Sequence, residues 1–456
     1  MKISFLVRNI TYPAWMVLQG DGGSLKYLNG FGKADRMTPE ELERENLQRL
    51  KGMLVHAYEN TVYYKNLFDE RGFSPYSFNE PSRIEVLPLL TKEIIRNNQA
   101  ALTTANIPEG DRFTASTGGS TGVPLVFLRD RKCRWLRWGQ EHYFNMWMKH
   151  DIGEKVALFV ENIHSYNPDS WRWARIRNAT CERLLPFNPH HITRDYMREF
   201  AGKYLRYRAP MIRCFPNSLA IFADFLEKEG IHSYPVRTIS CTGETLYGWQ
   251  KRFFERAFGA EIFEKYASTE CGTMASECRM HDGMHIFTQG IHMEIIKPDG
   301  EIAGPGEMGK IVITDLFNRA MPLVRYEIGD MAVAGDGKIC RCGSPLPLVK
   351  KILGRDREIV LDMKGDPKPG YLFAEAVKSL NLPGQFQIEQ TERGRLLVRI
   401  VNLGKSTDTG AIRSKCLEIM GEGAKIDFEY PEEIKRNPSG KYSYVISRVS
   451  PFRDKS

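Results

Sequence analysis

Short apolar runs alternate with longer amphipathic stretches in the middle of the chain. Three runs have the length and composition of buried strands: 155–160, 236–240 and 262–266. Two stretches have the pattern of helices: 217–229 and 246–258. Strand alternating with helix predicts a doubly wound, mostly parallel sheet, and ligands bind such sheets beyond the carboxyl ends of the strands.

The first 110 residues have a mainly helical pattern. Leucines at helical spacing follow Thr38 and Pro39, which are typical of an N-cap and a first helical position, so a helix is predicted over 39–54. Thr91 is expected to cap another helix. The segment 63–65 and the proline-containing residues after it are expected to form loop.

The rest of the pattern divides the chain into a large and a small domain. Further strands and helices are expected at 124–128 (strand), 134–149 (aromatic-rich helix), 290–308 (β-meander) and 310–316 (strand). A small α+β stretch follows Arg357. We therefore expect an α/β fold with a large N-terminal doubly wound domain and a β-rich subdomain over 1–355, and a small, mobile α+β C-terminal domain over 356–456.

Composition adds the class of protein and its compartment. The 456 residues are 42% hydrophobic and 26% charged, as in a soluble globular protein. No apolar run approaches the length of a membrane span, and the N-terminus lacks a secretory pattern, so a cytoplasmic protein is expected. Nine cysteines in such a chain favour thiols or metal ligands over disulfides.

The formal net charge of +8 is compatible with nucleic acid, an anionic membrane surface or a nucleotide as partner. No basic block with interleaved aromatic residues occurs, so nucleic-acid binding is not expected and a diffusely basic, solvated surface is the simplest explanation. A protein that binds polyanions or membrane surfaces stays as an alternative. The oligomeric state is open, a homodimer included.

Residues 116–124 have the composition of a phosphate-binding loop. Three glycines free the backbone, and four hydroxyl side chains add donors to the amide N–H groups. A flexible linker is the alternative for such a run alone. The candidate phosphate ligands are Ser116, Thr117, Gly118, Gly119, Ser120, Thr121 and Gly122.

Two predicted strands end in segments that suit a nucleotide. The first is 240–244 and the second is 266–272. Glu270 could ligate Mg²⁺ between phosphate oxygens, and Tyr266 could stack on a base. Further along, Asp330 follows Gly329 and could accept hydrogen bonds from a ribose diol. Glu270 alone could equally be a solvated turn carboxylate.

Five motifs in order over 116–441 resemble those of the adenylate-forming enzymes. They are the Gly/Ser/Thr loop, Tyr-x-Ser-Thr-Glu, Arg-Tyr-x-x-Gly-Asp, Gly-Arg-x-x-Glu and a C-terminal Pro-Ser-Gly-Lys. The short N-terminal region and the pattern Cys-x6-His followed by Cys-x-Cys-Gly look most like the phenylacetate–CoA ligase branch, especially its CapK-like members associated with polysaccharide biosynthesis.

The resemblance implies a role for each matching residue. Lys441 would be the catalytic lysine between the acid and the α-phosphate, and Glu270 would ligate Mg²⁺. The remaining nucleotide contacts would be the 116–122 loop, Gly243, Glu244, Tyr266, Ala267, Ser268, Thr269, Asp330 and Arg355.

Two positions depart from the family pattern. Leu125 stands where many members have a lysine, so charge neutralisation there would rest on Mg²⁺ and backbone donors. Arg357 stands at the hinge, where Asp or Lys is usual. Family members swing the C-terminal domain about this hinge between adenylation and thioester formation.

A cysteine and histidine cluster completes the set of candidate sites. Cys278, Cys340 and Cys342, with either His281 or His285, offer the soft ligands of a closed, structural Zn²⁺ site. His285 fits the family spacing and His281 the shorter zinc-like spacing, and we favour His285. Thiols without metal are the alternative.

Together these features predict an ATP- and Mg²⁺-dependent ligase that activates a carboxylic acid as its acyl-AMP, releases pyrophosphate and transfers the acyl group to CoA. An amine of a sugar or amino acid is the alternative acceptor. A nucleotide-binding protein without turnover is the alternative from another class. The acyl pocket is expected between the helix around Trp135 and Trp138, Asn217 and Ser218, Gly243 and the 267–272 turn.

Overall fold

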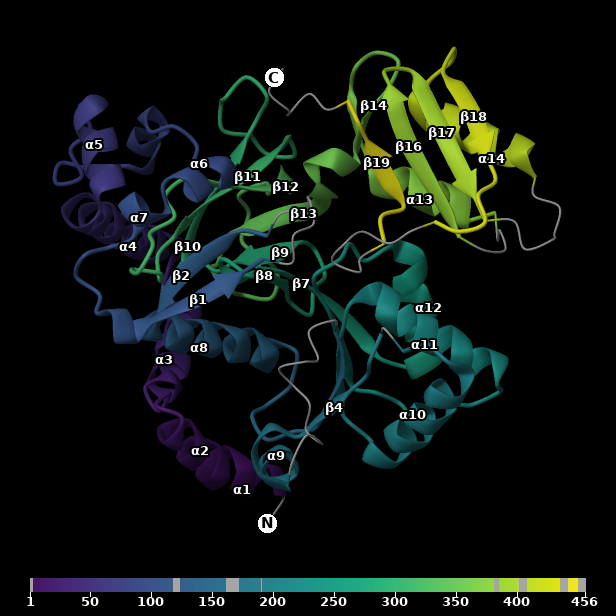
Figure 1. Ribbon diagram of the computed structural model, residues 1–456, viewed down its shortest axis with the longest axis horizontal. Helices are drawn as coiled ribbons and strands as arrows, with labels where there is room; N and C mark the ends of the chain where they lie inside the picture. The colour runs from purple at the N-terminus through teal and green to yellow at the C-terminus, as the bar shows by residue number, and fades with distance from the viewer. Residues whose placement is uncertain are drawn as a thin grey trace.

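The computed structural model describes residues 3–117, 124–160, 172–189, 191–380, 385–401, 408–434 and 442–449 (Figure 1). Within these ranges a large mixed sheet and a smaller C-terminal sheet each have their own helices and hydrophobic core. This arrangement agrees with the expected α/β fold.

The N-terminal helices begin where the sequence predicts. Helix α4 (Pro39–Asn60) has Thr38 as N-cap, and Thr38 and Glu41 form a reciprocal capping box. Helix α6 (Lys92–Asn97) begins after Thr91, whose hydroxyl accepts from the Ile94 amide. The shorter helices around them are α1 (Ile3–Leu6), α2 (Tyr12–Leu18), α3 (Ser24–Phe31) and α7 (Gln99–Leu102).

One expectation for this region is wrong. The segment 63–65 is not loop but part of helix α5 (Val62–Glu70), which begins after Thr61. The Thr61 hydroxyl accepts from the Tyr64 amide, and Tyr64 and Phe68, one helical turn apart, are buried in the core shared with the large sheet. The local cap and the tertiary burial outweigh the prolines that follow.

The large sheet has eleven strands in the described residues, in the order β10-β11-β12-β13-β9-β8-β7-β6-β5-β3-β4. Five of them are parallel: β4 (Leu184–Pro186), β3 (Val156–Phe159), β5 (Met211–Cys214), β6 (Thr238–Cys241) and β7 (Glu261–Ser268). Helices pack together on one face of these strands, as Figure 1 shows: α10 (Arg194–Tyr207), α11 (Pro216–Lys228) and α12 (Gly248–Phe258). Helix α8 (Arg131–Trp147) packs against β8, and α9 (Arg172–Arg177) lies between β3 and β4 in the chain.

The other half of the sheet is antiparallel: β8 (Gly272–Glu277), β9 (Met284–Ile286), β10 (Ile291–Ile296), β11 (Met308–Asp315), β12 (Tyr326–Ala334) and β13 (Leu348–Arg355). A separate antiparallel pair consists of β1 (Arg112–Ser116) and β2 (Val126–Asp130), and the predicted phosphate loop lies between these two strands in the chain.

The C-terminal unit has its own four-stranded sheet in the order β18-β17-β16-β19. Its strands are β16 (Phe386–Glu392), β17 (Arg395–Ile400), β18 (Lys425–Glu429) and β19 (Val445–Ser447), and its helices are α13 (Gly370–Lys378) and α14 (Thr409–Met420). Strands β14 (Ile359–Leu361) and β15 (Pro367–Pro369) form a small hairpin before it. Tyr247 of the larger unit is buried in the core of the C-terminal unit.

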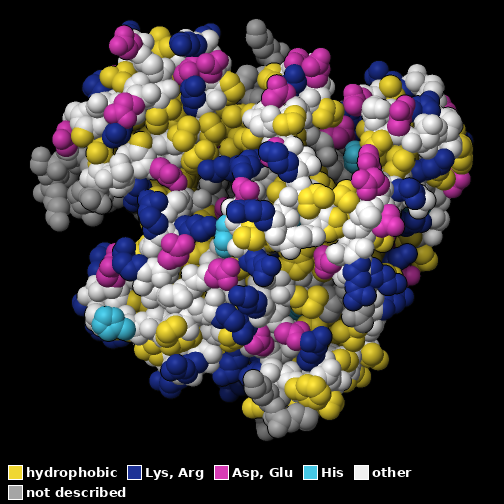
Figure 2. Space-filling model, turned by 180° about the vertical axis from the view of Figure 1, so that it is seen from behind, with side chains coloured by type: hydrophobic (Ala, Val, Ile, Leu, Met, Phe, Trp, Pro, Cys, Tyr) yellow, Lys and Arg dark blue, Asp and Glu magenta, His cyan; other side chains and the backbone are white. Residues whose placement is uncertain are grey.

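In the described parts of the chain, no helix combines the length and the apolar character that crossing a membrane requires. The face in Figure 2 carries Lys and Arg over much of its surface, with Asp and Glu interspersed among them. On this face the basic charge is therefore spread out, as expected for a solvated surface.

Candidate nucleotide site and cysteine cluster

The tip of the β1–β2 hairpin is closed by Thr117 and Leu125. The Thr117 amide donates to the Leu125 carbonyl at 2.9 Å, and the Leu125 amide donates to the Thr117 hydroxyl, also at 2.9 Å. Ser116 is the last residue of β1. The other predicted phosphate ligands, at 118–122, lie outside the described residues.

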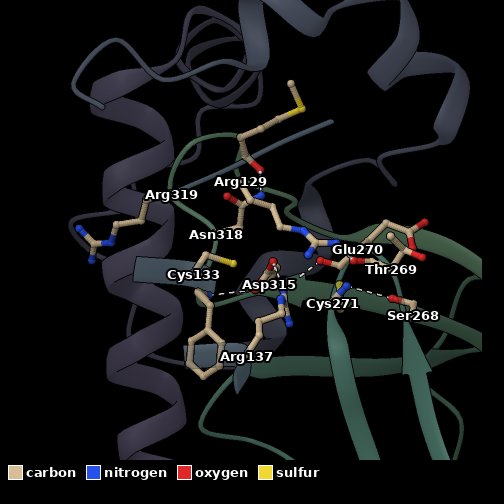
Figure 3. A network of polar contacts seen from close by, with 12 residues as sticks. Arg129, Cys133, Arg137, Ser268, Thr269, Glu270, Cys271, Asp315, Asn318 and Arg319 are labelled. Atoms are coloured by element: carbon tan, nitrogen blue, oxygen red, sulfur yellow. Dashed lines mark hydrogen bonds and ion pairs between the residues drawn. The ribbon is translucent and has the colours of Figure 1, made fainter. Parts of the chain in front are cut away.

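Two arginines fasten the turn that carries Glu270 (Figure 3). Arg137 donates to the Glu270 carbonyl at 2.9 Å and to the buried Asp315 carboxylate at 2.6 Å. Arg129, on the hairpin strand β2, donates to the Thr269 carbonyl. Side-chain contacts therefore hold the hairpin next to the Glu270 turn, and no sequence motif predicts these contacts.

The turn is also stabilised from within. The Ser268 hydroxyl accepts from the Cys271 amide at 2.9 Å. Gly272 has φ +67°, and a Cβ there would lie 2.7 Å from Gln140 and 2.8 Å from Arg137 of α8. Only glycine allows this close approach of helix and turn. Ala267 lies within β7, opposite Thr273 of β8.

The Glu270 side chain is buried and points at a tyrosine. The Tyr326 hydroxyl donates to Glu270 Oε1 at 2.8 Å, and burial together with the Glu270 charge raises the pKa of Tyr326. A carboxylate oriented in this way has the chemistry of a Mg²⁺ ligand, because Mg²⁺ is bound through one or two carboxylates plus phosphate oxygens.

Asp330 of β12 is held by two partners, one from the adjacent strand β13 and one from β7. Tyr266 donates to Asp330 Oδ2 at 2.7 Å, and Arg355 Nε lies 3.0 Å from Asp330 Oδ1. Arg355 also donates to the Ile328 carbonyl. Each carboxylate oxygen can accept a second hydrogen bond. The arrangement is therefore compatible with the ribose diol that the sequence predicts as its ligand.

Sequence reasoning did not identify Lys92 as a site residue. It is the first residue of α6, and the segment before it is fixed to β12 because Leu90 exchanges hydrogen bonds with Arg325 and Glu327. Burial lowers the pKa of Lys92, the Arg355 charge adds to this effect, and the Glu270 and Asp330 charges oppose it. A lysine whose charge interacts with both carboxylates carries no local motif, and only the tertiary contact of Leu90 with β12 reveals it.

Gly243 and Glu244 follow β6 at the level of Tyr266, because Cys241 pairs with Glu264 on the parallel neighbour. Gly243 has φ +76°, and a Cβ there would lie 2.4 Å from the Phe215 ring. Glu244 accepts from the Asn217 amide in the first turn of α11. A negatively charged acceptor at the N-terminus of a helix stabilises the helix, because it interacts favourably with the helix dipole.

The acyl pocket expected around Trp135 and Trp138 stays a prediction, and the structure shows the polar partners of these two side chains in the N-terminal segment. Trp135 Nε1 donates to Asp21, and Trp138 stacks on Tyr12 and donates to its hydroxyl. The helical period turns these two side chains toward the N-terminal segment, while the face with Arg137 and Gln140 meets the turn.

The structure brings Cys278, His285, Cys340 and Cys342 together, with their ligand atoms all within 4.8 Å of one another. Cys278 Sγ lies 3.6 Å from Cys340 Sγ, and Cys342 Sγ lies 3.4 Å from His285 Nε2. A tetrahedron with Zn–S bonds of about 2.3 Å has S···S edges of about 3.8 Å and S···N edges of about 3.6 Å. His281 instead contacts Glu277 at 3.1 Å.

The surroundings of the cluster also fit a metal. His285 Nδ1 lies 2.9 Å from the Leu346 carbonyl, which would orient Nε2 toward the thiols. The amides of Met280 and Ser344 donate to Cys278 and Cys342. Burial raises the pKa of Cys278 to about 12, so thiolates there need a cation, and Zn²⁺ would supply it.

Lys441 lies outside the described residues, so the structure does not show its distance to the nucleotide residues. The next residue, Tyr442, packs edge-on against Tyr444 at 4.8 Å between ring centroids. Tyr444 in turn packs at 5.2 Å against Tyr247, which lies three residues after Glu244.

Comparison with known proteins gives three kinds of similarity. A family model described as the CapK C-terminal domain matches residues 370–448. The phenylacetate–coenzyme A ligase of Escherichia coli K12 is 25% identical over 373 residues, which are 78% of this chain and 81% of that protein. Protein CapK of Staphylococcus aureus is 20% identical over 416 residues, 88% of each chain.

A crystal structure of 2-hydroxyisobutyryl-CoA ligase in the postadenylation state, in complex with R3-HIB-AMP, has the same fold. The TM-score is 0.72 over 91% of each chain, at 19% sequence identity. The chain therefore belongs to the adenylate-forming ligase superfamily, in its phenylacetate–CoA ligase and CapK-like family.

Proposed function

We propose that the protein is an ATP-dependent acid ligase that forms an acyl-AMP from a carboxylic acid, releases pyrophosphate and transfers the acyl group to CoA. The observation that carries the proposal is the paired arrangement of carboxylates: Asp330 held by Tyr266 and Arg355, and Glu270 held by Tyr326, beside the β1–β2 hairpin. The distant homology to phenylacetate–coenzyme A ligases supports CoA as the acceptor.

In this proposal each group has a separate role. Asp330 accepts hydrogen bonds from the ribose hydroxyls, and Tyr266 and Arg355 fix its orientation. Glu270 ligates the Mg²⁺ that neutralises the phosphates. Lys92, whose charge interacts with that of Glu270, contributes a positive charge that compensates for the missing lysine at Leu125.

Activation joins two anions, because a carboxylate attacks the α-phosphorus of ATP and pyrophosphate leaves. A lysine between the two stabilises the charge that spreads in the transition state. We assign this role to Lys441, on the strength of the Pro-Ser-Gly-Lys motif that ends there.

The cysteine cluster would hold a structural Zn²⁺. It joins the end of β8, β9 and the 340–342 turn before β13, and β13 carries Arg355 opposite Asp330. Zinc at this place would fix the register of the strands that carry the ribose contacts, without taking part in the chemistry.

Exchange of labelled pyrophosphate into ATP tests the proposal. A panel of aryl, fatty and sugar-derived acids is supplied without any acceptor, and exchange with one class is expected. Lys441→Ala should abolish the exchange, whereas Lys425→Ala, at an exposed position on β18, should leave it unchanged. ATP binding without exchange for every acid would contradict the proposal and favour a nucleotide-binding protein.

The acceptor is tested next, with the acid that supports exchange. Product formation with CoA is expected. Product formation only with an amine of a sugar or amino acid would replace CoA in the proposal and leave the activation step intact.

A further inference from the structure

One face of helix α13 contacts the larger unit. Tyr371, Glu375 and Lys378 are spaced four and three residues apart, so they share that face. Each has a partner from the part of the chain that carries the large sheet: Lys351 of β13, Gly248 of α12 and Trp249 of α12, respectively. We call these six residues the α13 clamp.

Glu375 caps a helix of the other unit. The Gly248 amide donates to Glu375 Oε1 at 2.6 Å, and Gly248 is the first residue of α12. A carboxylate at a helix N-terminus is favourable for hydrogen bonding and for the helix dipole. A Cβ on Gly248 would lie 3.0 Å from the same oxygen, so glycine permits the approach.

Lys378 and Lys351 add cation–π contacts across the boundary. Lys378 Nζ lies 5.1 Å from the Trp249 ring, and the rings of Phe386 and Tyr444 lie 5.6 Å and 5.8 Å away. Lys351 Nζ lies 3.5 Å from the centroid of the Tyr371 ring. Contacts of this kind stabilise most when they are shielded from water, and Lys378 is partly buried.

The clamp also determines where the segment before β19 lies. Tyr444, which borders Lys378, packs on Tyr247, and Tyr442 is among the polar neighbours of Tyr247 together with Glu244. Gly370, at the start of α13, closely approaches Val445 of β19. With the clamp closed, the chain next to Lys441 therefore runs beside the 244–247 segment.

We propose that the α13 clamp holds the C-terminal unit in the orientation that forms acyl-AMP, so that Glu375 and Lys378 are positioning residues for Lys441. The inference rests on the proposed function. An orientation that separates α13 from α12 and β13 must break these contacts. Weakening the clamp should therefore slow activation and spare transfer.

The test uses the full chain with Glu375→Ala and Lys378→Met. The matched controls are Glu418→Ala and Lys415→Met on α14, where the two exposed residues pair with each other. Pyrophosphate exchange measures activation, and transfer from supplied acyl-AMP to CoA measures the second step. The clamp variants should lose about tenfold in exchange, the size of one shielded cation–π or helix-terminus contact, while transfer keeps its rate. The controls should keep both rates.

Hydrogen–deuterium exchange of residues 247–250 gives a readout that does not need activity. The Gly248 amide should exchange faster in Glu375→Ala and at the parent rate in Glu418→Ala. Equal losses in both half-reactions, or unchanged pyrophosphate exchange despite faster amide exchange, would overturn the proposal. Should no acid support exchange in the parent chain, the proposed function fails; unaltered amide exchange in Glu375→Ala would then overturn the clamp as well.

Discussion

Positive charges around Glu270 and Asp330 come from distant parts of the chain. Lys92 precedes the predicted phosphate loop, and Arg355 ends β13, the last strand of the large sheet along the chain. Arg355 pairs directly with Asp330, whereas Lys92 interacts with both carboxylates through their charges. The two cations therefore act differently, because Arg355 orients a carboxylate, whereas Lys92 is a point charge on a flexible stem that suits a phosphate.

Replacing Lys92 tests this difference. Lys92→Met keeps the aliphatic stem and removes the charge, so pyrophosphate exchange should fall by about tenfold to a hundredfold, as for other losses of charge stabilisation in a transition state. Lys65→Met, on the exposed side of α5, is the control and should retain the parent rate. Equal rates for the two variants would exclude Lys92 from the activation step.

At the scale of helices, strands and turns, the turns that follow the strands determine the shape of the site. Gly243 has a positive φ and leaves no room for a Cβ beside the Phe215 ring. The Glu270 turn depends on Gly272 and on two arginines from other elements. Strand register then aligns these turns, since β6 and β7 are parallel and end at the same edge.

Gly243→Ala should destabilise the protein and slow activation. The new Cβ meets both an unfavourable φ of +76° and the Phe215 ring at 2.4 Å. Gly337→Ala is the matched control, because Gly337 has φ +73° and nothing within 4 Å of the added Cβ. In chemical denaturation we expect a loss of about 1 kcal/mol for the control, and about 2–4 kcal/mol for Gly243→Ala. Similar losses of unfolding free energy for the two variants would show that the Phe215 ring moves aside at little cost.

The cysteine cluster predicts one zinc ion per chain, held by His285 and not by His281. His285→Gln should lower the bound zinc well below one equivalent and lower the melting temperature, since three thiols would share an incomplete site. His281→Gln should retain the metal, because its ring contacts Glu277. Metal analysis of protein purified without added zinc measures this. Substoichiometric zinc in the parent chain, with a fold that survives a strong chelator, would refute the site.

At the scale of the whole molecule, Glu358 lies where the two units meet. Its carboxylate is close to Gly354 of β13, its carbonyl is close to Gly370 of α13, and its charge acts on Tyr247. Burial raises the pKa of Glu358 to about 7, although Arg357 and Arg355 oppose the shift. The boundary between the units therefore contains a carboxyl group that titrates near neutral pH.

This shift has a definite consequence for stability. Between about pH 4.5 and 7 the folded protein retains a proton on Glu358 that the unfolded chain releases, so the stabilising effect of this group is lost as the pH rises to 7. Glu358→Gln mimics the protonated side chain. Relative to the parent, its free energy of unfolding should be about 3 kcal/mol higher at pH 8 and unchanged at pH 4.5. A constant difference at both pH values would contradict the shift.

Local signals predict much of the fold. The cap at Thr38, the cap at Thr91 and the alternation of strands and helices over 155–266 depend on residues close in sequence, and each is confirmed. The loop expected at 63–65 is wrong because the burial of Tyr64 comes from the large sheet. The contacts of Trp135 with Asp21 and of Trp138 with Tyr12 could not be predicted, because these partners lie more than a hundred residues away.

The sequence by itself determined the family, through five motifs in order, and the chemistry available to the site: carboxylates, a phosphate loop, thiols and a terminal lysine. The motifs and the chemical groups depend on residue types and their spacing, and both can be read directly from the sequence. Only the tertiary structure decided which of these side chains lie close to one another. It placed Lys92 beside Glu270 and Asp330, chose His285 over His281, and set Glu375 at the start of α12. Such encounters depend on strand register and on the packing of helices far apart in sequence, and no local pattern encodes them.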